Sequence, residues 1–564
     1  MTRTVIVGGT AAGTTVAARL RRLDETAEII LYEKNEFVSS AVCGFPYYIG
    51  NVIRDAGMLR VQTARTLGEK FKMDVRTCSE VISISPQEKN LQVKNLKTGE
   101  IYSEHYDNLV LATGTVQNIP ANIDFEAPGI FTLRTVSDAE KINAFIGDKK
   151  GLTALVYGSG FAGVEIADNL QHRGINTVLV GRGPHALRHF DRDLAALIDL
   201  QIKVSRIRFL QETVIAKAGL SGDGTGRLEA VLSDGTVINP DFIVVATGNR
   251  PDSRLAEKAG IALNDNKTIR VDSRMRTSVP DVYAVGDVIE FCSFVSGMNQ
   301  HIALAGPAYR QARVCADNIA GLKSSEYHGA QNTAVIKIND LTAAYTGMNT
   351  DQLEQLKKKR QGFDYVPLLV SGKSHAGFYP RSVPVIIKAF FDKKQGRLLG
   401  AQAIGGEGID KRIDVLAGII RARGTYQDLA EADFCYAPPF SAANDVLNFL
   451  GFMADNYFRS LAVYILWDEV EKEIDSGNSK FTVLDVREAM ETGFSSFKGA
   501  VNIPLGELRD RLDELPKNNT IAVTCAVGVR AYNAARILMQ NGFNDVRVIC
   551  GGMHLYRSLH WKPY

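Results

Sequence analysis

The sequence predicts an α/β protein with two nucleotide-binding domains, a following α+β domain and a small C-terminal α/β domain. A pattern of strand, glycine-rich turn, helix and strand occurs at residues 4–33 and returns at residues 154–180. This pattern is typical of a parallel sheet that binds a dinucleotide at its glycine turn. The glycine turns stop at about residue 331, and a new strand-and-helix unit begins at about residue 466.

Length and composition narrow the class of protein. A chain of 564 residues predicts roughly three to four domains. The net charge of +2 gives no overall signal for nucleic acid or a membrane surface. The seven cysteines are scattered, which favours a reducing compartment, and no apolar stretch is long enough to span a bilayer. We therefore expect a cytoplasmic protein with no nucleic-acid partner, no membrane partner and no metal site.

The first nucleotide-binding pattern includes the acid that follows the second strand of the motif. Residues 4–7 form an apolar strand, residues 14–23 continue as a helix, and the strand at residues 28–32 ends at Glu33. In a Rossmann-like domain the turn allows the helix N-terminus to hold a pyrophosphate, and the acid binds a ribose hydroxyl. Thr10 replaces the middle glycine of the motif. The predicted turn residues are Gly8, Gly9, Thr10, Ala11, Ala12 and Gly13.

The second pattern has all three motif glycines. Two such patterns in one chain imply two dinucleotides, and a flavin with a nicotinamide is the pair suited to electron transfer. The strand at residues 177–180 is followed by Gly181 and Arg182 rather than by an acid. An Arg at this place accommodates the phosphate of NADPH, so NADPH is slightly favoured over NADH. The predicted contacts are Gly158, Gly160, Phe161, Ala162, Gly163, Glu165 and Arg182.

A third phrase belongs with the first pattern. Residues 277–287 contain an apolar strand that ends in Gly286 and Asp287. A carboxylate at the end of such a strand can bind a polyol chain. Two further strands end in the same Ala-Thr-Gly tripeptide, at residues 112–114 and 246–248.

Cys43 is the candidate redox centre. It lies in the stretch Ser39–Tyr48 and has no second cysteine in the five positions that follow it. A lone thiol can form a mixed disulfide with another molecule, a persulfide or a sulfenic acid, but no internal disulfide. Taken alone, Cys43 has the alternative of a buried and inert cysteine, which is the commoner case.

The C-terminal part has its own candidate thiol. Cys525 follows an apolar strand at residues 520–524, and the loop at residues 525–530 runs into a helix at residues 531–540. Backbone N–H groups and Arg530 at such a turn suit a bound anionic sulfur. A buried cysteine at a strand end is the alternative. Residues 451–465 are expected to be a linker.

These motifs together carry a resemblance to a known family. The first 450 or so residues resemble the flavin disulfide reductase superfamily, and within it coenzyme A-disulfide reductases with their persulfide-reductase and NADH-oxidase relatives. The last hundred resemble a rhodanese domain, through residues 485–487, 499–504 and 525–530. The order matches fusions of the two. The implied domains are an FAD-binding domain at 1–118 and 246–330, an NAD(P)-binding domain at 119–245, a dimerisation domain at 331–450, the linker at 451–465 and a rhodanese domain at 466–564.

The resemblance also implies roles for single residues. FAD lies against the first glycine turn, with Glu33 on its ribose and Asp287 on its ribityl chain, and Cys43 faces the flavin. Tyr379 and Tyr436 match a tyrosine pair that reaches the thiol of the partner in a homodimer. Further cofactor contacts are expected from Lys34, Thr113, Gly114, Gly248 and Pro307. Coenzyme A, as a bound ligand or part of the substrate, is expected to contact Thr15, Arg19, Arg22, Ser39, Lys70 and Lys72.

The stretch before the thiol departs from the family pattern. The family usually reads Ser-Phe-Ala-Asn-Cys, whereas this chain reads Ser-Ser-Ala-Val-Cys, which removes an aromatic ring and an amide beside Cys43. Phe71 falls where relatives that bind coenzyme A can carry a basic residue. Both departures bear on whether coenzyme A disulfide is the substrate.

The sequence therefore favours an FAD-dependent NAD(P)H oxidoreductase that reduces persulfide or polysulfide sulfur at Cys43, with Cys525 accepting the sulfur first. Three alternatives stay open: a coenzyme A-disulfide reductase with a mixed disulfide on Cys43, an NADH oxidase or peroxidase with a sulfenic acid there, and a sulfur transferase centred on Cys525. The sulfur donor, the choice between NADH and NADPH, and the subunit that the rhodanese domain serves are also open at this point.

Overall fold

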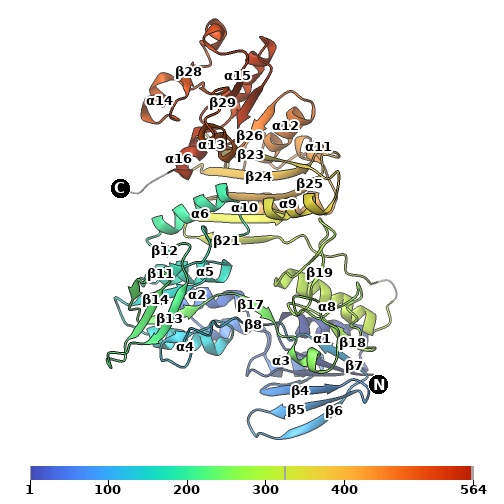
Figure 1. The fold of residues 1–564 in the computed structure, drawn as a ribbon. Helices are drawn as coiled ribbons and strands as arrows, with labels where there is room; N and C mark the ends of the chain where they lie inside the picture. The colour runs from blue at the N-terminus through green and yellow to red at the C-terminus, as the bar shows by residue number, and fades with distance from the viewer. Residues whose placement is uncertain (1, 323–324, 561–564) are drawn as a thin grey trace. The chain divides into compact units, whose positions relative to one another are not determined.

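The computed structural model describes residues 2–322 and 325–560. The chain divides into two compact units, Met1–Pro184 with Arg206–Ala330 and His185–Ser205 with Gln331–Tyr564. Both combine helices with strands (Figure 1), which confirms the predicted α/β class. Within the described residues, every helix is too short or too polar to cross a lipid bilayer.

The first unit holds a parallel sheet in the order β18-β7-β1-β2-β3. Four of its strands, β18, β7, β1 and β2, are largely apolar and buried, as expected for a parallel sheet that is covered on both faces. Ile6, Leu31 and Leu109 in three of them are fully buried. Helices α1 (Ala11–Leu23) and α8 (Ala305–Ile319) pack against each other beside the sheet (Figure 1). The strand bounds are β1 (Arg3–Val7), β2 (Glu28–Tyr32), β3 (Asp74–Arg76), β7 (Asn108–Leu111) and β18 (Val282–Ala284).

A second parallel sheet in the same unit has the order β12-β11-β10-β16-β9. Strand β10 pairs with β11 and β16, so the second glycine turn follows a central strand, as the first does. The elements are β9 (Ile130–Phe131), β10 (Thr153–Tyr157), β11 (Asn176–Val180), β12 (Arg208–Leu210), β16 (Phe242–Val245), α4 (Val136–Ile146) and α5 (Phe161–His172).

Smaller elements complete the first unit. Two three-stranded antiparallel sheets are formed by β4 (Ser79–Ser85), β5 (Asn90–Asn95) and β6 (Ile101–His105), and by β13 (Ile215–Leu220), β14 (Leu228–Leu232) and β15 (Val237–Ile238). Two two-stranded pairs are β8 (Thr115–Gln117) with β17 (Asn249–Pro251) and β19 (Phe291–Cys292) with β20 (Asn299–Gln300). The short helices are η1 (Val42–Gly44), α2 (Phe45–Ile49), η2 (Ala56–Leu59), α3 (Ala64–Phe71) and α7 (Arg254–Lys258).

The second unit begins with an antiparallel sheet in the order β21-β22-β25-β24-β23. Helix α6 (Arg192–Val204) groups with this unit, although residues 185–205 fall within the range expected for the NAD(P)-binding domain. The buried Lys388 ammonium joins Asp191 at 2.9 Å and Asp193 at 2.8 Å, which ties the start of α6 to the sheet. The other elements are β21 (Ala334–Ile338), β22 (Leu341–Gly347), β23 (Tyr365–Lys373), β24 (Pro384–Asp392), β25 (Leu398–Gly405), α9 (Thr350–Lys359), α10 (Ile409–Arg421), α11 (Tyr426–Ala430) and α12 (Val446–Phe458).

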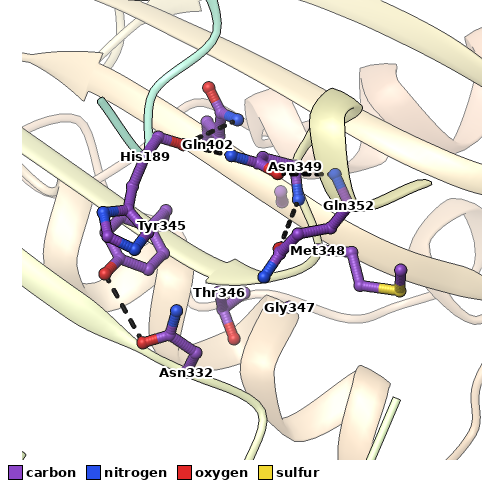
Figure 2. A pocket seen from close by; sticks show the side chains of 10 residues that line it. His189, Asn332, Tyr345, Thr346, Gly347, Met348, Asn349, Gln352 and Gln402 are labelled. Carbon is purple, nitrogen blue, oxygen red and sulfur yellow. Dashed lines mark hydrogen bonds between the residues drawn. The ribbon is translucent and has the colours of Figure 1, made fainter. Parts of the chain in front are cut away.

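A small polar cavity lies between this sheet and His189, in the segment that leads into α6. Figure 2 shows the His189 ring stacked on the Tyr345 ring, at a centroid distance of 5.5 Å, and the Tyr345 hydroxyl directed toward Asn332. The Gln402 side chain donates to the Asp191 carboxylate at 3.0 Å. The cavity has a volume of about 10 Å³, which suits one water molecule and is too small for a cofactor.

The C-terminal domain is a third parallel sheet, in the order β26-β30-β29-β27-β28. The elements are β26 (Val463–Ile465), β27 (Phe481–Asp485), β28 (Val501–Asn502), β29 (Thr520–Thr524), β30 (Val546–Ile549), α13 (Trp467–Asp475), α14 (Ala489–Phe494), α15 (Val529–Gln540), α16 (Gly552–Leu559), η3 (Leu508–Asp510) and η4 (Leu512–Glu514).

Residues 451–465, expected to be a linker, are largely regular structure. Helix α12 continues to Phe458, and β26 joins the C-terminal sheet by pairing with β30. One apolar cluster contains Leu369 of β23 together with Trp467 and Met553 of the C-terminal domain. The Tyr532 hydroxyl also donates to Asn456 of α12 at 3.0 Å. These contacts hold the C-terminal domain against the antiparallel sheet of the same unit.

Candidate functional site

The first group of candidate residues lies just beyond the carboxyl ends of three neighbouring parallel strands. Strands β1, β7 and β18 are neighbours in register, so Gly8, Thr113 and Asp287 follow them at one edge of the sheet. A Cβ placed on Gly286 would lie 3.0 Å from the Cβ of Ala12 in α1. The structure thus brings the Gly-Asp phrase next to the first glycine turn, where ligands bind in such sheets.

The first glycine turn has the geometry that a pyrophosphate requires. Gly8 has φ +111°, and a Cβ there would collide with the Ala112 carbonyl oxygen. A Cβ on Gly13 would collide with the Gly8 carbonyl oxygen, so both positions need glycine for helix and strand to approach. Helix α1 starts with no side-chain cap and no acidic residue in its first turn. Its first N–H groups are consequently available to an anion, and the turn fits a dinucleotide such as FAD.

Glu33 lies at the end of β2, where the motif predicts the ribose-binding acid. Its carboxylate is buried and accepts the Gly9 N–H at 2.8 Å. It also accepts the Asn35 backbone N–H at 2.8 Å and the Asn35 side-chain amide at 2.6 Å. These bonds hold the carboxylate beside the glycine turn.

The second glycine turn repeats this construction. A Cβ on Gly158 would collide with the Ala246 carbonyl oxygen, and one on Gly163 with the Gly158 carbonyl oxygen. A Cβ on Gly160 would meet no protein atom within 4 Å. Helix α5 also begins without a side-chain cap or an acid in its first turn. The open space at Gly160 therefore fits a second phosphate group, as NAD(P)H would bring. Arg182 is exposed just after β11.

The remaining expected cofactor contacts lie after strands of both parallel sheets and in α8. The Thr113 hydroxyl donates to the Asp252 carbonyl oxygen at 2.7 Å, and Lys34 lies 3.5 Å from the Asp252 carboxylate. Gly114 and Gly248 both have positive φ, and Pro307 is buried in α8. The cofactor role of each of these residues stays a prediction.

Asp287 has a basic neighbour that the sequence motifs did not indicate. Burial raises the pKa of the Asp287 carboxyl, and the charge of Arg134 opposes this shift. Arg134 also donates to the Thr115 carbonyl and hydroxyl oxygens, both at 2.9 Å. The His301 ring lies 2.7 Å from the Asp287 carbonyl oxygen. Arg134 stands between the two glycine motifs in sequence and belongs to neither, so no pattern marked it.

Cys43 lies in the one-turn helix η1, directly before α2. Helix α2 packs on α5, the helix that follows the second glycine turn. Cys43 is exposed in this structure. The surrounding protein nevertheless desolvates the sulfur and raises the pKa of the Cys43 thiol, and the carboxylates of Glu165 and Asp287 add to this rise. Residues from both nucleotide motifs therefore act electrostatically on one sulfur.

Glu165 and Tyr47 form a polar contact close to this sulfur. Burial raises the pKa of the Glu165 carboxyl to about 7, against an opposing effect of the Tyr47 hydroxyl. Burial, and then the charge of Glu165, raises the pKa of Tyr47. Glu165 was expected to contact only a cofactor. Tyr47 was not singled out, although it stands in the Cys-Gly-Phe-Pro-Tyr-Tyr stretch, four residues after the thiol.

The residues expected to bind coenzyme A are distributed over α1 and α3. Arg21 joins these helices by donating to the carbonyl oxygens of Phe71 and Lys72, each at 2.9 Å. Arg22 is exposed and lies over the Phe71 ring, 5.4 Å from its centroid. Arg19 is paired with Asp317 at 2.8 Å, so its charge is already balanced within the chain.

The other members of that set differ in availability. Lys70 and Lys72 are exposed at the end of α3. The Thr15 hydroxyl donates to the Ala11 carbonyl oxygen at 2.7 Å, inside α1. Ser39 has φ +51° and donates its N–H to the Gly9 carbonyl oxygen at 2.7 Å. Ser39 thus links the thiol segment to the glycine turn.

The two loops that carry Tyr379 and Tyr436 come together in the second unit. The Ala376 N–H donates to the Ser441 carbonyl oxygen at 3.0 Å. The fully buried Arg412 donates to the Ser374 carbonyl oxygen at 2.9 Å and forms a bidentate pair with Asp445 at 2.9 and 2.6 Å. Arg412, which the sequence motifs missed, therefore holds both loops. Tyr379 and Tyr436 project from them with 42% and 49% of their surface exposed.

The Cys525 loop lies in the C-terminal domain. The Cys525 side chain is buried, and its sulfur accepts the Gly528 N–H at 3.1 Å. The Cys525 carbonyl accepts the Met553 N–H at 2.8 Å, which fixes the loop against α16. Arg530 closes the loop, but its guanidinium is engaged with Glu491, at 2.6 and 2.8 Å. Glu491 lies 39 positions away in sequence, and no motif pointed to it.

Comparison with known proteins places this geometry in a family. Residues 2–312 match the pyridine nucleotide-disulphide oxidoreductase family. The chain belongs to this family. Residues 333–446 match the dimerisation domain of pyridine nucleotide-disulphide oxidoreductases, and residues 466–559 match the rhodanese-like domain. The chain is thus a pyridine nucleotide-disulphide oxidoreductase that carries a C-terminal rhodanese-like domain.

Similar individual proteins indicate which members of the family this chain most resembles in sequence and fold. This oxidoreductase is 33% identical to the coenzyme A disulfide reductase of Staphylococcus epidermidis, over 80% of this chain and 100% of the relative. It is similar to the reduced CoADR-RHD of Bacillus anthracis, with a TM-score of 0.93 and 41% identity over 99% of this chain and 98% of that one. It is also similar to an NAD-dependent persulfide reductase from A. fulgidus, with a TM-score of 0.89 and 32% identity over 98% and 100% of the chains. The family resemblance inferred from the motifs is confirmed.

Proposed function

We propose that this oxidoreductase uses FAD and NAD(P)H to reduce sulfane sulfur held on Cys43, and that Cys525 of the rhodanese-like domain takes up sulfur from a donor. The observation that supports it most is the position of Cys43 beside residues of both nucleotide motifs, Glu165 and Asp287. Among the described residues every cysteine is free, so an internal dithiol does not compete with this role.

The chemistry at Cys43 is a sulfur transfer followed by reduction. The Cys43 thiolate attacks the outer sulfur of a persulfide, a new S–S bond forms, and the donor leaves as a thiolate with the electron pair of the broken S–S bond. Bound FAD and NAD(P)H supply the two electrons that reduce this adduct. With one proton, the outer sulfur leaves as hydrogen sulfide and the Cys43 thiolate is restored. Glu165 and Tyr47 are the nearby groups that can hold or move this proton.

A homodimer is the proposed assembly. The match to a dimerisation domain supports it. The two loops that carry Tyr379 and Tyr436 also expose the large apolar side chains of Phe378 (79%) and Phe440 (71%), which a partner subunit can cover. In the dimer these loops would complete the partner's Cys43 site. Analytical ultracentrifugation tests the assembly, and a fully active monomer would contradict it.

The domain ranges and ligand contacts are proposed as the motifs suggest. The FAD-binding, NAD(P)-binding, dimerisation and rhodanese domains take the ranges given above. NADPH is slightly favoured because Arg182 is exposed at the end of β11, where it can reach a ribose phosphate. The kcat/KM values for NADPH and NADH compare the two directly. Arg22, Lys70 and Lys72 are the basic residues proposed to meet the phosphates of coenzyme A.

A coenzyme A-disulfide reductase is the second candidate function. It is favoured by the identity of 33% to the coenzyme A disulfide reductase of Staphylococcus epidermidis. Steady-state turnover on coenzyme A disulfide, coenzyme A persulfide, polysulfide and oxygen, with sulfide measured, separates the candidates. Sulfide as the main product supports persulfide reduction. Free coenzyme A without sulfide would favour the second candidate, and water or peroxide would favour an oxidase.

A further inference from the structure

Arg530, the one arginine of the Cys525 loop, is already paired with Glu491. Two guanidinium nitrogens of Arg530 donate to the two carboxylate oxygens of Glu491, at 2.6 and 2.8 Å. This is the bidentate geometry with which an arginine binds an oxyanion. A side chain of the same domain therefore fills the place that an anionic substrate would take on Arg530.

Glu491 is held in this place by its own segment. Its carboxylate also accepts the Glu488 N–H at 3.2 Å, and its backbone N–H donates to the Glu488 carbonyl at 2.9 Å. Arg487, buried in an ion pair with Asp485, donates to the Glu491 carbonyl at 3.4 Å and to the Ser495 carbonyl at 2.7 Å. The segment that carries Glu491 is thus anchored on both sides of the residue.

Both members of the Arg530–Glu491 pair are charged at neutral pH. The hydrogen bond from Arg530 lowers the pKa of the Glu491 carboxyl to about 2, so Glu491 stays ionised throughout the range in which enzymes work. The pKa of Arg530 is raised first by Glu491 and also by the charge of the Cys525 sulfur. Burial, and then Arg557 and Arg487, lowers the pKa of His554, which therefore adds no charge here at neutral pH.

We propose that Glu491 is a specificity-determining residue that occupies the anion site of Arg530 and turns the Cys525 loop away from oxyanionic sulfur donors. The inference rests on the proposed uptake of sulfur by Cys525. A donor with a sulfonate group must displace Glu491 from Arg530 or lie beside its negative charge, and either costs binding energy. An alkyl persulfide has no oxyanion group to place on Arg530, so Glu491 disfavours it far less.

The two reactions to be compared balance in the same way. With thiosulfate, the Cys525 thiolate forms a bond to the outer sulfur, and sulfite leaves with the electron pair of the broken S–S bond. With an alkyl persulfide, the outer sulfur is transferred and the alkyl thiolate leaves. Cyanide then takes the outer sulfur from either adduct, which gives thiocyanate and restores the Cys525 thiolate. No reductant is needed, so this assay does not depend on electron transfer.

The test measures thiocyanate formation by the full-length holoenzyme with thiosulfate and with 2-hydroxyethyl persulfide as donors. Glu491→Gln keeps the shape of the side chain and removes its charge. We expect its kcat/KM for thiosulfate to rise about five- to tenfold, mainly through a lower KM, because one charged bidentate pair no longer competes. The kcat/KM for the alkyl persulfide should stay within about twofold, and Glu491→Asp should leave the preference close to that of the wild type.

Glu514→Gln is the matched control. Glu514 forms the same bidentate pair with Arg511, at 2.6 and 2.8 Å, in the same domain. Glu514→Gln should change the kcat/KM for neither donor. The ratio of the two kcat/KM values is the decisive quantity, because it does not depend on the fraction of each preparation that is folded.

An unchanged or lower thiosulfate-to-persulfide ratio in Glu491→Gln would overturn the inference while leaving the sulfur-accepting role of Cys525 in place. An equal rise in Glu514→Gln would also overturn it, since the effect would then be one of overall charge. The absence of thiocyanate from both donors in every variant would overturn the proposed role of Cys525, and this inference with it.

Discussion

At the scale of single residues, the carboxyl of Glu165 is the group whose ionisation the fold alters most usefully. It lies in the first turns of α5, close to Tyr47 and the Cys43 sulfur, and burial raises its pKa from 4.5 to about 7. A carboxyl with this pKa can change its protonation state near neutral pH, which a general acid or base needs. Its position near the thiol follows from the packing of α2 on α5.

This pKa has a consequence for stability. The folded state holds the Glu165 proton more tightly than the unfolded state does, so the contribution is complete below pH 4.5 and is lost as pH rises through about 7. The loss should be on the order of 1–3 kcal/mol. We expect Glu165→Gln to reduce the fall in Tm between pH 5 and pH 8, measured by calorimetry.

The exposed Glu126→Gln variant serves as the control for a lost surface charge. Parallel Tm curves for Glu165→Gln and the wild type would show that Glu165 titrates normally in the folded protein.

At the scale of elements, two glycines of the second turn that lie three residues apart have different roles. One is needed for packing, and the other leaves room for a ligand. A Cβ on Gly163 would collide with the backbone of Gly158, whereas a Cβ on Gly160 meets only open space. We expect Gly163→Ala to lower the stability of this domain by roughly 1–3 kcal/mol, as overpacking does. Gly160→Ala should leave Tm unchanged and raise the KM for NAD(P)H, because its methyl group enters the phosphate site.

Thermal melts and steady-state kinetics of the two variants test this assignment. A Gly160→Ala enzyme with the wild-type KM for both NADPH and NADH would contradict the placement of a phosphate at this turn.

Part of the fold and of the candidate site was predictable from the sequence, and part was not. The glycine turns, the acid at the end of β2 and the Gly-Asp phrase were predictable because a parallel sheet brings the carboxyl ends of its strands to one edge. Arg134, Arg412 and Glu491 were not, because each reaches its partner across a distance in sequence that no local pattern encodes. The helix that crosses the expected linker was missed because a connector was inferred from domain order rather than from apolar periodicity.

At the scale of the whole molecule, contacts within the second unit fix the rhodanese-like domain. Its apolar cluster with β23 and the hydrogen bond between Tyr532 and Asn456 oppose free movement. We propose that sulfur taken up at Cys525 reaches Cys43 on a carrier or within the assembly, whereas a small donor approaches Cys43 directly.

We accordingly expect Cys525→Ser to reduce polysulfide at close to the wild-type rate and to lose turnover on larger donors. Sulfide release from donors of increasing size, in both proteins, measures this. An equal loss for every donor would make Cys525 obligatory, and no loss for any donor would mean that the two thiols work separately.

The central claim is that one cysteine, Cys43, carries the sulfur that NAD(P)H reduces. Its most direct test is sulfide release from polysulfide by Cys43→Ser, with reduction of the bound FAD by NAD(P)H followed in the same preparation. The account predicts that the FAD is bound and reduced as in the wild type, while sulfide release falls to the background without enzyme. Continued sulfide release at the wild-type rate in Cys43→Ser would contradict it.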